Sequence, residues 1–405
     1  MQSESFDVCV VGGAGHIGLP FALVLASKGL DVAIYDIDQA ALDVIAAGRV
    51  PFIEDGAEAL LADAIDRGNL HLSSQAQVAG QASTLVVIIG TDVDRFTNPD
   101  LDAVRACFED LLPHLRDDQH IILRSTVFPG TTDWLAGWLA DHGVNPMISC
   151  CPERVLQGKA IEELQSLPQV ISGTSAAAVE AAEAFFARIG AETVRLAPME
   201  AEFAKLFSNA YRYISFAIAN QFYMITSSAG VDYDRIMRAV KHNYPRLQGL
   251  PSAGYAAGPC LFKDTMQLNA FAKNQFQLGQ AAMNVNEGLV LHVVGQMEQQ
   301  FDLANMTVGL LGMAFKADID DIRSSLSYKF KRLLQFKTKQ VLTTDPYVTV
   351  DPELKPLEDV IEKSDVLVLC APHRQYRDLH LDGKPVVDVW GYLGQGTLVP
   401  EGTVA

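Results

Sequence analysis

The stretch VCVVGGAGHIGLP at residues 8–20 decides which fold to expect for this chain. Its first four residues are apolar and mostly β-branched, which predicts a buried strand. Three glycines follow in the order G-x-G-x-x-G, and the apolar residues after them predict a helix. In such a unit the backbone approaches a pyrophosphate, which lies at the positive end of the helix. The predicted cofactor-binding residues of this turn are Gly13, Gly15, His16, Ile17 and Gly18.

An acidic residue stands where this kind of site needs one. Asp36 ends the second predicted strand, Val32–Tyr35, about 20 residues beyond the glycines. Its carboxylate can accept hydrogen bonds from ribose hydroxyls and repels a 2′-phosphate, which favours NAD over NADP.

Further apolar runs continue the pattern and predict a parallel sheet covered by helices on both faces. They are residues 85–89, 121–123 and 147–149. Thr91 and Thr126 lie just past two of these runs, where open α/β sheets bind ligands. Both are site candidates, although ordinary strand-to-helix turns would look the same.

Composition bounds the function. The 405 residues suffice for two or three domains, and 49% of them are hydrophobic, so a substantial core can form. The formal net charge of −18 argues against a nucleic-acid or anionic-membrane partner. The six cysteines are scattered and form no CxxC pair, the histidines show no zinc spacing, and no apolar run is long enough to span a bilayer. We expect a cytoplasmic protein without a metal.

The middle of the chain has a different pattern. From Pro198 to Gly230 apolar residues recur at helical spacing, which predicts one long helix suited to an interdomain spine or a dimer interface. More helix is expected from about Asp264 to Phe301, and β/α alternation resumes at Thr307. The fold class is therefore α/β, with predicted domains at 1–197, 198–303 and 304–405.

Several polar residues suggest chemistry. Cys260 has Lys263 three residues on and Asp264 four residues on, and a cation lowers the pKa of a nearby thiol. Lys205 and Asn209 are spaced i, i+4 on the long helix and share a face that suits an oxyanion. The alternatives are a small buried cysteine and the solvated edge of an amphipathic helix.

Glu153 is a further candidate, because it follows the predicted strand at residues 147–149. It is either a site carboxylate or an ion-pair partner for Arg154.

Six motifs in order resemble the UDP-glucose/GDP-mannose dehydrogenase family of nucleotide-sugar 6-dehydrogenases, over essentially the whole length. Beyond the glycine turn they are STVFPGTT at 125–132, CPERVL at 151–156, EFAKLFSNAY at 202–211, GPCLFKD at 258–264 and FKADIDDIRSS at 315–325. The resemblance implies two Rossmann-like domains joined by a long central helix and a helical dimerisation domain, a homodimer, NAD as cofactor and a nucleotide-sugar substrate. It also implies four-electron oxidation of the sugar C6 hydroxyl to a uronate, as in polysaccharide biosynthesis.

The resemblance assigns roles to residues. Cys260 is the implied nucleophile, Lys205 and Asn209 hold the C6 oxygen, and Asp264 orients Lys205 and a water. Glu153 serves the hydrolytic step as base or acid, with Thr126 positioning the water. The implied cofactor contacts include Asp36, Thr91, Thr126, Lys263 and Arg323. The implied substrate contacts include Glu153, Lys205, Asn209, Tyr255, Gly258, Lys316 and, from the neighbouring subunit, Arg246.

The nucleophile loop departs from the family pattern at Ala257, Leu261 and Phe262, which affects the expected loop shape and sugar preference. The Cys-Pro-Glu-Arg form at 151–154 is typical of the UDP-N-acetylmannosamine branch, while the Lys263-Asp264 pair resembles the UDP-glucose branch. We expect the base to be selected by the C-terminal sheet and by loops such as Pro372-His373.

Alternatives remain at this stage. They are a GDP-mannose 6-dehydrogenase, a two-electron dehydrogenase of the 6-phosphogluconate or β-hydroxyacid type, and a nucleotide sensor without catalysis.

Overall fold

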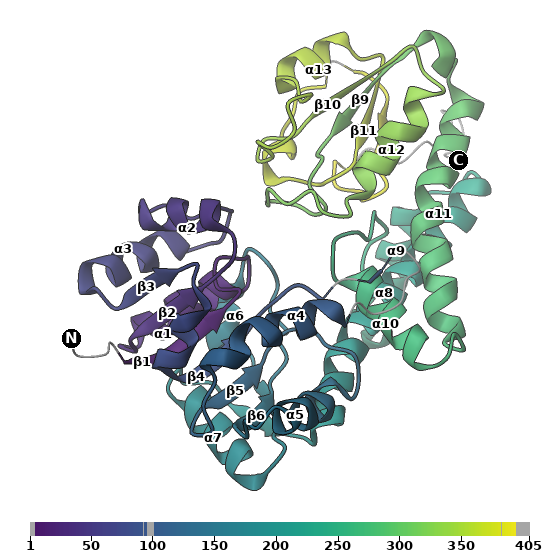
Figure 1. The fold of residues 1–405 in the computed structure, drawn as a ribbon. Helices are drawn as coiled ribbons and strands as arrows, with labels where there is room; N and C mark the ends of the chain where they lie inside the picture. The colour runs from purple at the N-terminus through teal and green to yellow at the C-terminus, as the bar shows by residue number, and fades with distance from the viewer. Residues whose placement is uncertain (1–4, 92, 95–100, 382, 394–405) are drawn as a thin grey trace. The chain divides into compact units, whose positions relative to one another are not determined.

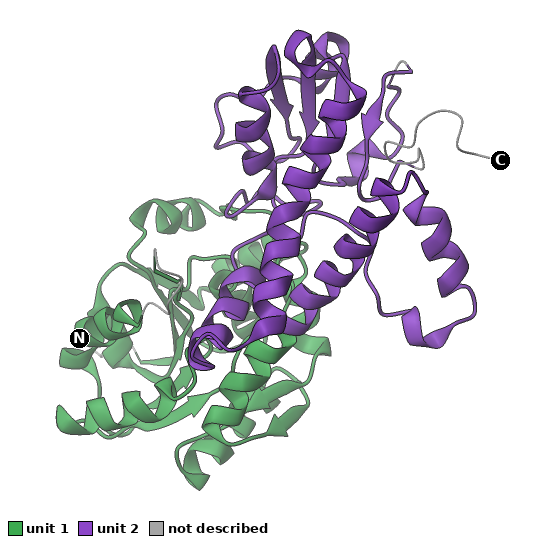
Figure 2. Cartoon of the chain, turned by 90° about the vertical axis from the view of Figure 1, so that its right-hand side faces the viewer, with its two compact units in different colours: residues 1–208 green, residues 209–405 purple. Residues whose placement is uncertain are grey.

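The computed structural model describes residues 5–91, 93–94, 101–381 and 383–393 (Figure 1). The chain divides into two compact units, residues 1–208 and 209–405, coloured separately in Figure 2. The boundary falls inside the helix α8 (Pro198–Ser228). Each unit contains its own parallel sheet, as the sequence predicted.

The first unit is built on a six-stranded sheet in the order β3-β2-β1-β4-β5-β6, with every neighbouring pair parallel. The direction of winding reverses between β1 and β4, so the carboxyl ends of these two strands form the switch point where such sheets bind ligands. The strands are β1 (Phe6–Val11), β2 (Val32–Tyr35), β3 (Leu70–Ser73), β4 (Ala82–Val87), β5 (His120–Leu123) and β6 (Met147–Cys150).

Successive residues of these strands point to opposite faces, and both faces are buried. Val8 and Val10 join a core with α1, α3, α6 and α7, while Cys9 and Val11 join a second core with α4 and α5. This is why the strands read as continuous apolar runs. The helices are α1 (Gly18–Ser27), α2 (Gln39–Ala46), α3 (Ala57–Arg67), α4 (Asp102–Leu111), α5 (Thr131–Asp141), α6 (Ala160–Ser166) and α7 (Ala176–Ala187), and a small parallel pair follows, β7 (Gln169–Ile171) with β8 (Thr193–Arg195).

The long helix predicted from Pro198 is confirmed as α8, which has 31 residues. Proline at the first helical position is favourable because its missing N–H needs no partner there. The Glu200 carboxylate accepts a hydrogen bond of 2.8 Å from the Ala197 amide, which caps the start. At the other end Gly230 adopts φ +68°, and the Val231 amide donates 2.9 Å to the Thr226 carbonyl, so a left-handed glycine ends the helix.

The second unit contains a four-stranded parallel sheet in the order β10-β9-β11-β12. Its strands are β9 (Thr307–Leu311), β10 (Gln340–Thr344), β11 (Val366–Leu369) and β12 (Val386–Val387). One face of the sheet packs with α11 (Gln277–Gln300) and α12 (Leu326–Gln335), and the other face packs with α13 (Leu357–Lys363).

Two details of the helical region were not predicted. α9 (Tyr233–Lys241) is a separate helix, and the stretch expected as helix from Asp264 is divided into α10 (Leu261–Phe271) and α11. Lys273 and Asn274 have φ values of +53° and +61° at the break, so two non-glycine residues in left-handed conformations make the turn.

Across the described residues, no helix combines the length and the apolar character that a bilayer crossing requires.

Candidate active site

Three of the four glycines in the turn after β1 have no room for a side chain. A Cβ on Gly12 would lie 2.2 Å from the Ile88 carbonyl oxygen, one on Gly13 2.7 Å from that of Val10, and one on Gly18 2.3 Å from that of Gly12. A Cβ on Gly15 meets only one atom, at 3.7 Å, so this residue faces open space. Three glycines therefore pack the turn, and the fourth leaves room for a ligand to approach the backbone.

The start of α1 suits an anion. Its N-cap, Ile17, makes no side-chain cap, and the first turn contains no acidic residue, so no carboxylate of that turn competes for the amides. The His16 ring stacks on Phe52 with 4.3 Å between centroids, which holds His16 beside the turn.

Asp36 lies beside the same turn, as predicted. One of its carboxylate oxygens accepts 2.9 Å from the Ala14 amide, and the other accepts 3.0 Å from the Asp38 amide. The residue is half-buried, so the carboxylate is ordered and still reachable from solvent. This arrangement fits the ribose of a dinucleotide.

The turns after β4 and β5 are joined to each other. The Thr91 hydroxyl donates to the Thr126 carbonyl, and the Ser125 hydroxyl donates 2.8 Å to the Ile89 carbonyl while accepting 2.8 Å from the Ile89 amide. Thr91 and Thr126 are therefore parts of one structure at the carboxyl edge of the sheet, next to the switch point.

Glu153 is buried and held by three donors. One oxygen, Oε1, accepts 2.5 Å from the Arg154 amide and 2.8 Å from the Val155 amide, and the other oxygen forms an ion pair with Arg124. The Arg154 side chain instead donates to the Pro168 carbonyl. The expected ion pair with Arg154 is therefore replaced by one with Arg124.

Arg124 was not predicted as a site residue, although a charge directly after the apolar run 121–123 was a signal. Its side chain has no exposure to solvent, and its guanidinium lies 4.5 Å from the Phe21 ring centroid and 5.1 Å from that of Phe186. It also donates 3.2 Å to the Cys151 carbonyl and 3.0 Å to Gln169. Arg124 thus positions both Glu153 and the chain that leads to it.

Glu202, three residues before Lys205 on α8, binds the start of α5. It accepts 2.6 Å from the Gly130 amide, and 2.8 Å and 2.6 Å from the amide and hydroxyl of Thr132. Burial raises the pKa of Glu202, against lowering by these hydrogen bonds. The contact fixes the first turns of α8, on which Lys205 is buried.

Asn209 follows Lys205 by about one helical turn on α8. Its amide donates 2.5 Å to the fully buried Asp264, whose other oxygen lies 3.6 Å from the Lys263 ammonium. The second unit therefore brings three of the predicted residues together: Asn209, Asp264 and Lys263.

Cys260 is exposed and occupies the N-cap position of α10. Helix N-termini favour a thiolate over a thiol, because unpaired amides point at the anion. The sequence pattern indicated that a cation, Lys263, activates the Cys260 thiol. The structure adds the N-terminus of α10 as a second group that favours the thiolate.

The loop before Cys260 packs closely against aromatic rings of the C-terminal sheet domain. Gly258 has φ +99°, and a Cβ there would lie 2.6 Å from the Phe315 ring; a Cβ on Gly254 would lie 2.1 Å from the Trp390 ring. Tyr255, which lies between these glycines in the sequence, is buried and packs edge-on against Trp390, with 6.0 Å between the ring centroids. Gly258 and Tyr255 thus help to fix the conformation of this loop.

Two buried asparagines outside the motifs hold the same loop. Asn220 of α8 donates 3.0 Å to the Gly254 carbonyl and accepts 2.8 Å from its amide, and it donates 2.9 Å to Asn286 of α11. Both asparagines are fully buried. The departures Leu261 and Phe262 pack in an apolar cluster with Tyr213, so the altered loop is well filled.

The FKADIDDIRSS segment lies directly after β9. Arg323 forms a bidentate ion pair with Asp321, with 2.6 Å between the closest atoms, and Lys316 follows the Phe315 ring that packs on Gly258. Arg246 lies on the short helix η3 (Pro245–Leu247), exposed, with its guanidinium 5.6 Å from the Tyr244 ring centroid.

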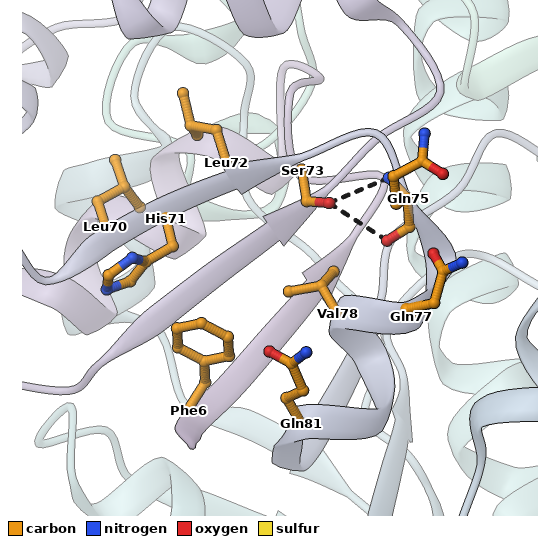
Figure 3. A pocket seen from close by; sticks show the side chains of 9 residues that line it. All are labelled: Phe6, Leu70, His71, Leu72, Ser73, Gln75, Gln77, Val78 and Gln81. Carbon is orange, nitrogen blue, oxygen red and sulfur yellow. Dashed lines mark hydrogen bonds between the residues drawn. The ribbon is translucent and has the colours of Figure 1, made fainter. Parts of the chain in front are cut away.

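A cavity of about 520 Å³ lies along β3 and the 3-10 helix η1 (Ala76–Gln81) (Figure 3). None of the predicted site residues lines it. Within the described part of the chain, no group of three or more His, Cys, Asp or Glu side chains is placed to hold a metal.

Comparison with known families gives one consistent match. Residues 6–190, 199–288 and 309–395 match the NAD binding, central and UDP binding domains of the UDP-glucose/GDP-mannose dehydrogenase family. Among curated relatives, a UDP-N-acetyl-D-mannosamine dehydrogenase of Pyrococcus horikoshii is 29% identical, over 91% of this chain and 90% of its own. An NDP-N-acetyl-D-galactosaminuronic acid dehydrogenase of Ralstonia nicotianae is 28% identical, over 95% of this chain and 96% of its own.

Solved structures agree with these relatives. A UDP-D-ManNAc dehydrogenase from Pyrococcus horikoshii has a TM-score of 0.88 at 26% identity, covering 98% of this chain and 97% of that one. A UDP-glucose dehydrogenase from Pyrobaculum islandicum has a TM-score of 0.86 at 26% identity, covering 96% of this chain and 95% of that one.

Proposed function

Since this chain belongs to the UDP-glucose/GDP-mannose dehydrogenase family and is an NAD-dependent nucleotide-sugar dehydrogenase, we propose that it oxidises the C6 hydroxyl of a UDP-N-acetylhexosamine to the uronate. Two relatives whose names specify N-acetylated sugars support this choice, as does the Cys-Pro-Glu-Arg form at residues 151–154. UDP-glucose is the second candidate, supported by the Lys263-Asp264 pair.

NAD fits the turn after β1. Gly15 faces open space, the α1 terminus has neither a side-chain cap nor an acid in its first turn, and Asp36 is fixed beside both. Bound NAD+ accepts a hydride, so two molecules are needed for each alcohol that becomes a carboxylate. The residues proposed to hold it are Gly13, Gly15, His16, Ile17, Gly18, Asp36, Thr91, Thr126, Lys263 and Arg323.

The first oxidation requires the C6 oxygen to lose its proton, which a water oriented by Asp264 is proposed to accept, while its carbon loses a hydride. Lys205 and Asn209, one turn apart on α8, are proposed to bind that oxygen and stabilise the negative charge that develops on it. Asp264 holds the Asn209 amide at 2.5 Å, so the amide is preset for this task.

Cys260 is proposed to make the second oxidation possible. Its thiolate adds to the aldehyde carbon and forms a thiohemiacetal, and removal of a second hydride leaves a thioester. Water then attacks the thioester with help from Glu153 and Thr126, and the uronate leaves while the thiol is restored. The exposed position of Cys260 at the N-cap of α10 is the observation that carries this assignment.

The substrate is proposed to contact Glu153, Tyr255, Gly258 and Lys316, and we assign the domains as 1–197 for NAD, 198–303 for the central helices and 304–405 for the nucleotide sugar. The family matches over 6–190, 199–288 and 309–395 support this division.

A cytoplasmic homodimer is also proposed, with Arg246 reaching the neighbouring subunit's sugar and the product feeding polysaccharide synthesis. Five exposed apolar residues form a stripe along α8, namely Phe207, Tyr211, Ile218, Phe222 and Ile225. The last two also line a mostly apolar hollow of about 270 Å³ with α9, which suits burial against a second copy. Six cysteines outside any disulfide support a reducing compartment.

One assay tests the proposal: NADH formation with UDP-N-acetylmannosamine, UDP-N-acetylglucosamine, UDP-N-acetylgalactosamine, UDP-glucose and GDP-mannose, each driven to completion. We expect two NADH per sugar with an N-acetylated UDP substrate. One NADH per sugar would indicate a two-electron dehydrogenase, and exclusive turnover of UDP-glucose or GDP-mannose would contradict the substrate class.

A further inference from the structure

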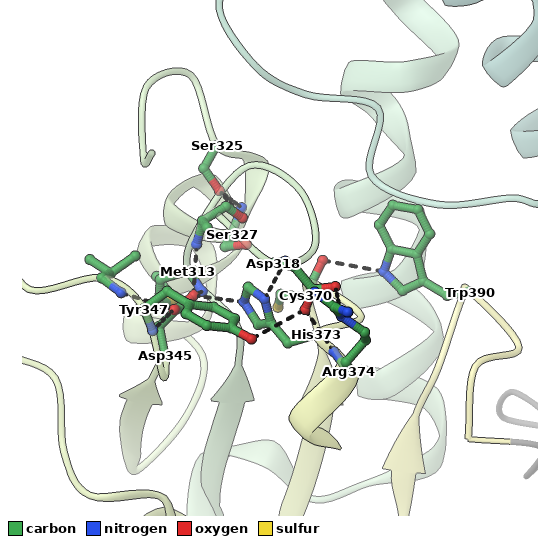
Figure 4. A network of polar contacts seen from close by, with 12 residues as sticks. Met313, Asp318, Ser325, Ser327, Asp345, Tyr347, Cys370, His373, Arg374 and Trp390 are labelled. Atoms are coloured by element: carbon green, nitrogen blue, oxygen red, sulfur yellow. Dashed lines mark hydrogen bonds and ion pairs between the residues drawn. The ribbon is translucent and has the colours of Figure 1, made fainter. Parts of the chain in front are cut away.

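The His373 side chain is fully buried in the second unit. It follows β11 in the loop that was expected to read the nucleotide base, yet its side chain has no exposure to solvent. Figure 4 shows it at the centre of a polar network that joins three loops of the second unit. The buried ring contacts partners within the protein, and selection of the base by this loop stays a prediction.

The hydrogen bonds fix the tautomer of His373. Its Nδ1 lies 2.9 Å from the Asp318 amide nitrogen, and an amide N–H can only donate, so Nδ1 accepts. The proton of the neutral ring is therefore on Nε2, which donates 3.0 Å to Oδ2 of Asp345.

Asp345 uses both of its oxygens. Oδ1 accepts from the Tyr347 and Val348 amides at 2.8 and 3.1 Å, and Oδ2 accepts from the Met313 and Ala314 amides at 2.6 and 2.9 Å as well as from His373. Burial raises the pKa of Asp345, but the hydrogen bonds from His373 and from the Ala314 and Tyr347 amides lower it further, so its pKa is below the usual value.

The two sheets use an equivalent acid differently. In the first unit Asp36 ends the strand beside β1 and accepts 2.9 Å from the Ala14 amide. In the second unit Asp345 follows the strand beside β9 and accepts 2.9 Å from the Ala314 amide, but its side chain is fully buried beneath His373. The second sheet therefore has no accessible carboxylate at this position for a ribose.

That loop, residues 313–325, depends on Asp318. Asp318 has φ +60°, which is unfavourable for a residue with a Cβ and persists only when the surroundings hold it. Its amide binds His373, and its carboxylate accepts 2.9 Å from the Arg374 amide and 2.8 Å from the Arg374 side chain. Lys316 and Arg323 lie on either side of this anchor.

We infer that His373 is a positioning residue: by joining Asp318 to Asp345 it presets the loop that presents Lys316 to the nucleotide sugar. The inference rests on the proposed function for the identity of the ligand. The matched region 309–395, described as a UDP binding domain, contains the whole network.

Two conservative variants separate the two hydrogen bonds of the ring. In His373→Asn the amide oxygen can replace Nδ1 and accept from Asp318, while in His373→Gln the amide nitrogen can replace Nε2 and donate to Asp345. If the Asp318 contact presets the loop, Asn should preserve UDP affinity better than Gln, and His373→Ala should be weakest.

The measurement is calorimetric titration of the full-length protein with UDP alone, together with hydrogen exchange of residues 313–325. We expect UDP to bind about ten-fold more weakly to the Gln and Ala variants, within about three-fold of wild type to Asn, and exchange in the loop to rise in the same order. NAD+ affinity should change less than UDP affinity, because Arg323 is the one residue proposed to hold NAD that lies in this loop. His120→Asn is the matched control, because His120 is also buried but lies in the first unit beside Ser149.

UDP affinity within two-fold of wild type in the folded Gln and Ala variants, an equal loss in all three, or the same loss in His120→Asn would overturn the inference. None of these readouts requires turnover. An inactive wild-type protein that binds UDP and responds as expected would therefore contradict the proposed reaction alone.

Discussion

A guanidinium without exposure to solvent, such as that of Arg124, must find all its partners inside the protein. Here two phenyl rings flank it and the Glu153 carboxylate pairs with it. The sequence indicated Glu153 and suggested its neighbour Arg154 as partner. The true partner comes from the end of another strand, and such pairings depend on how strands align in the sheet rather than on sequence distance.

Cys260 gives the most direct prediction at the residue scale. Cys260→Ala should reduce uronate formation by about a thousand-fold or more, because no covalent intermediate can form. Cys260→Ser should accumulate a covalently held or slowly hydrolysed ester, since an alkoxide is a poorer leaving group. Mass spectrometry of the intact protein after substrate addition detects the adduct.

The matched control is Cys107→Ala. Burial chiefly, together with Asp110, raises the pKa of Cys107 to about 12, so this thiol is inert at neutral pH. Cys260→Ala with undiminished formation of two NADH per sugar would contradict the assignment of the nucleophile.

At the scale of elements, the hydrophobic pattern predicted the helices and strands whose residues are buried at a regular period. The strands of both sheets and α8 were predicted because their residues are apolar at the correct period. β3 was not, because all four of its residues, Leu70–Ser73, are only half-buried and include His71. α9 was not, although its apolar residues recur at i, i+3, i+4 and i+7 from Tyr233, because the pattern covers only nine residues.

Glu202 tests how α8 is attached. Glu202→Ala leaves two backbone donors and a hydroxyl without their acceptor, which should cost about 1–3 kcal/mol of stability and lower kcat through Lys205. Thermal unfolding and steady-state kinetics measure the two effects.

Glu200→Ala is the comparison, because it removes a carboxylate from the same turn that caps only the Ala197 amide. It should cost about 1 kcal/mol or less and leave kcat unchanged. Equal losses of stability and activity in both variants would mean that Glu202 has no special role.

At the scale of the whole molecule, Asp234 predicts a dependence of stability on pH. Burial, then Asp232 and Asp388, raise the pKa of Asp234 to about 6, against lowering by Arg238. A carboxyl whose pKa is higher in the folded state binds protons more readily there, so this group makes the protein more stable as pH falls from 7 toward 4.

Asp234→Asn removes this titration. Relative to wild type, the variant should gain about 1 kcal/mol between pH 5 and pH 7, after allowance for the partial exposure of Asp234. Urea unfolding at pH 5, 6 and 7 measures the difference, with the exposed Asp66→Asn as control. A difference that stays constant or shrinks with rising pH would show that burial of Asp234 is not costly.

Arg246 tests assembly. If it acts on the neighbouring subunit's site, mixing Cys260→Ala with Arg246→Ala protomers restores one intact site in each heterodimer. Activity should recover to about a quarter of wild type after random reassociation. No recovery, with heterodimers verified by native mass spectrometry, would exclude action between subunits.

Motifs predicted more of the candidate site than geometry could have done. The resemblance named Cys260, Asp264 and Asn209, and the structure joins the last two through a 2.5 Å hydrogen bond. It did not name Asn220 or Asn286, and His373 was named only as part of a loop expected to select the base. The side chains of these three residues act through a partner more than 20 residues away in the chain. Such pairings cannot be predicted from a single sequence, because the partners are far apart in the chain and meet only in the folded protein.

The burial of the other cysteines makes Cys260 a natural chemical label. Burial raises the pKa of Cys9, Cys107, Cys151 and Cys370 to about 12, and that of Cys150 well above its usual value, whereas Cys260 is exposed. A mild alkylating reagent at neutral pH should therefore mark one thiol per folded chain. The same reagent would count functional sites in a preparation and allow a fluorophore to be attached without engineering a cysteine-free background.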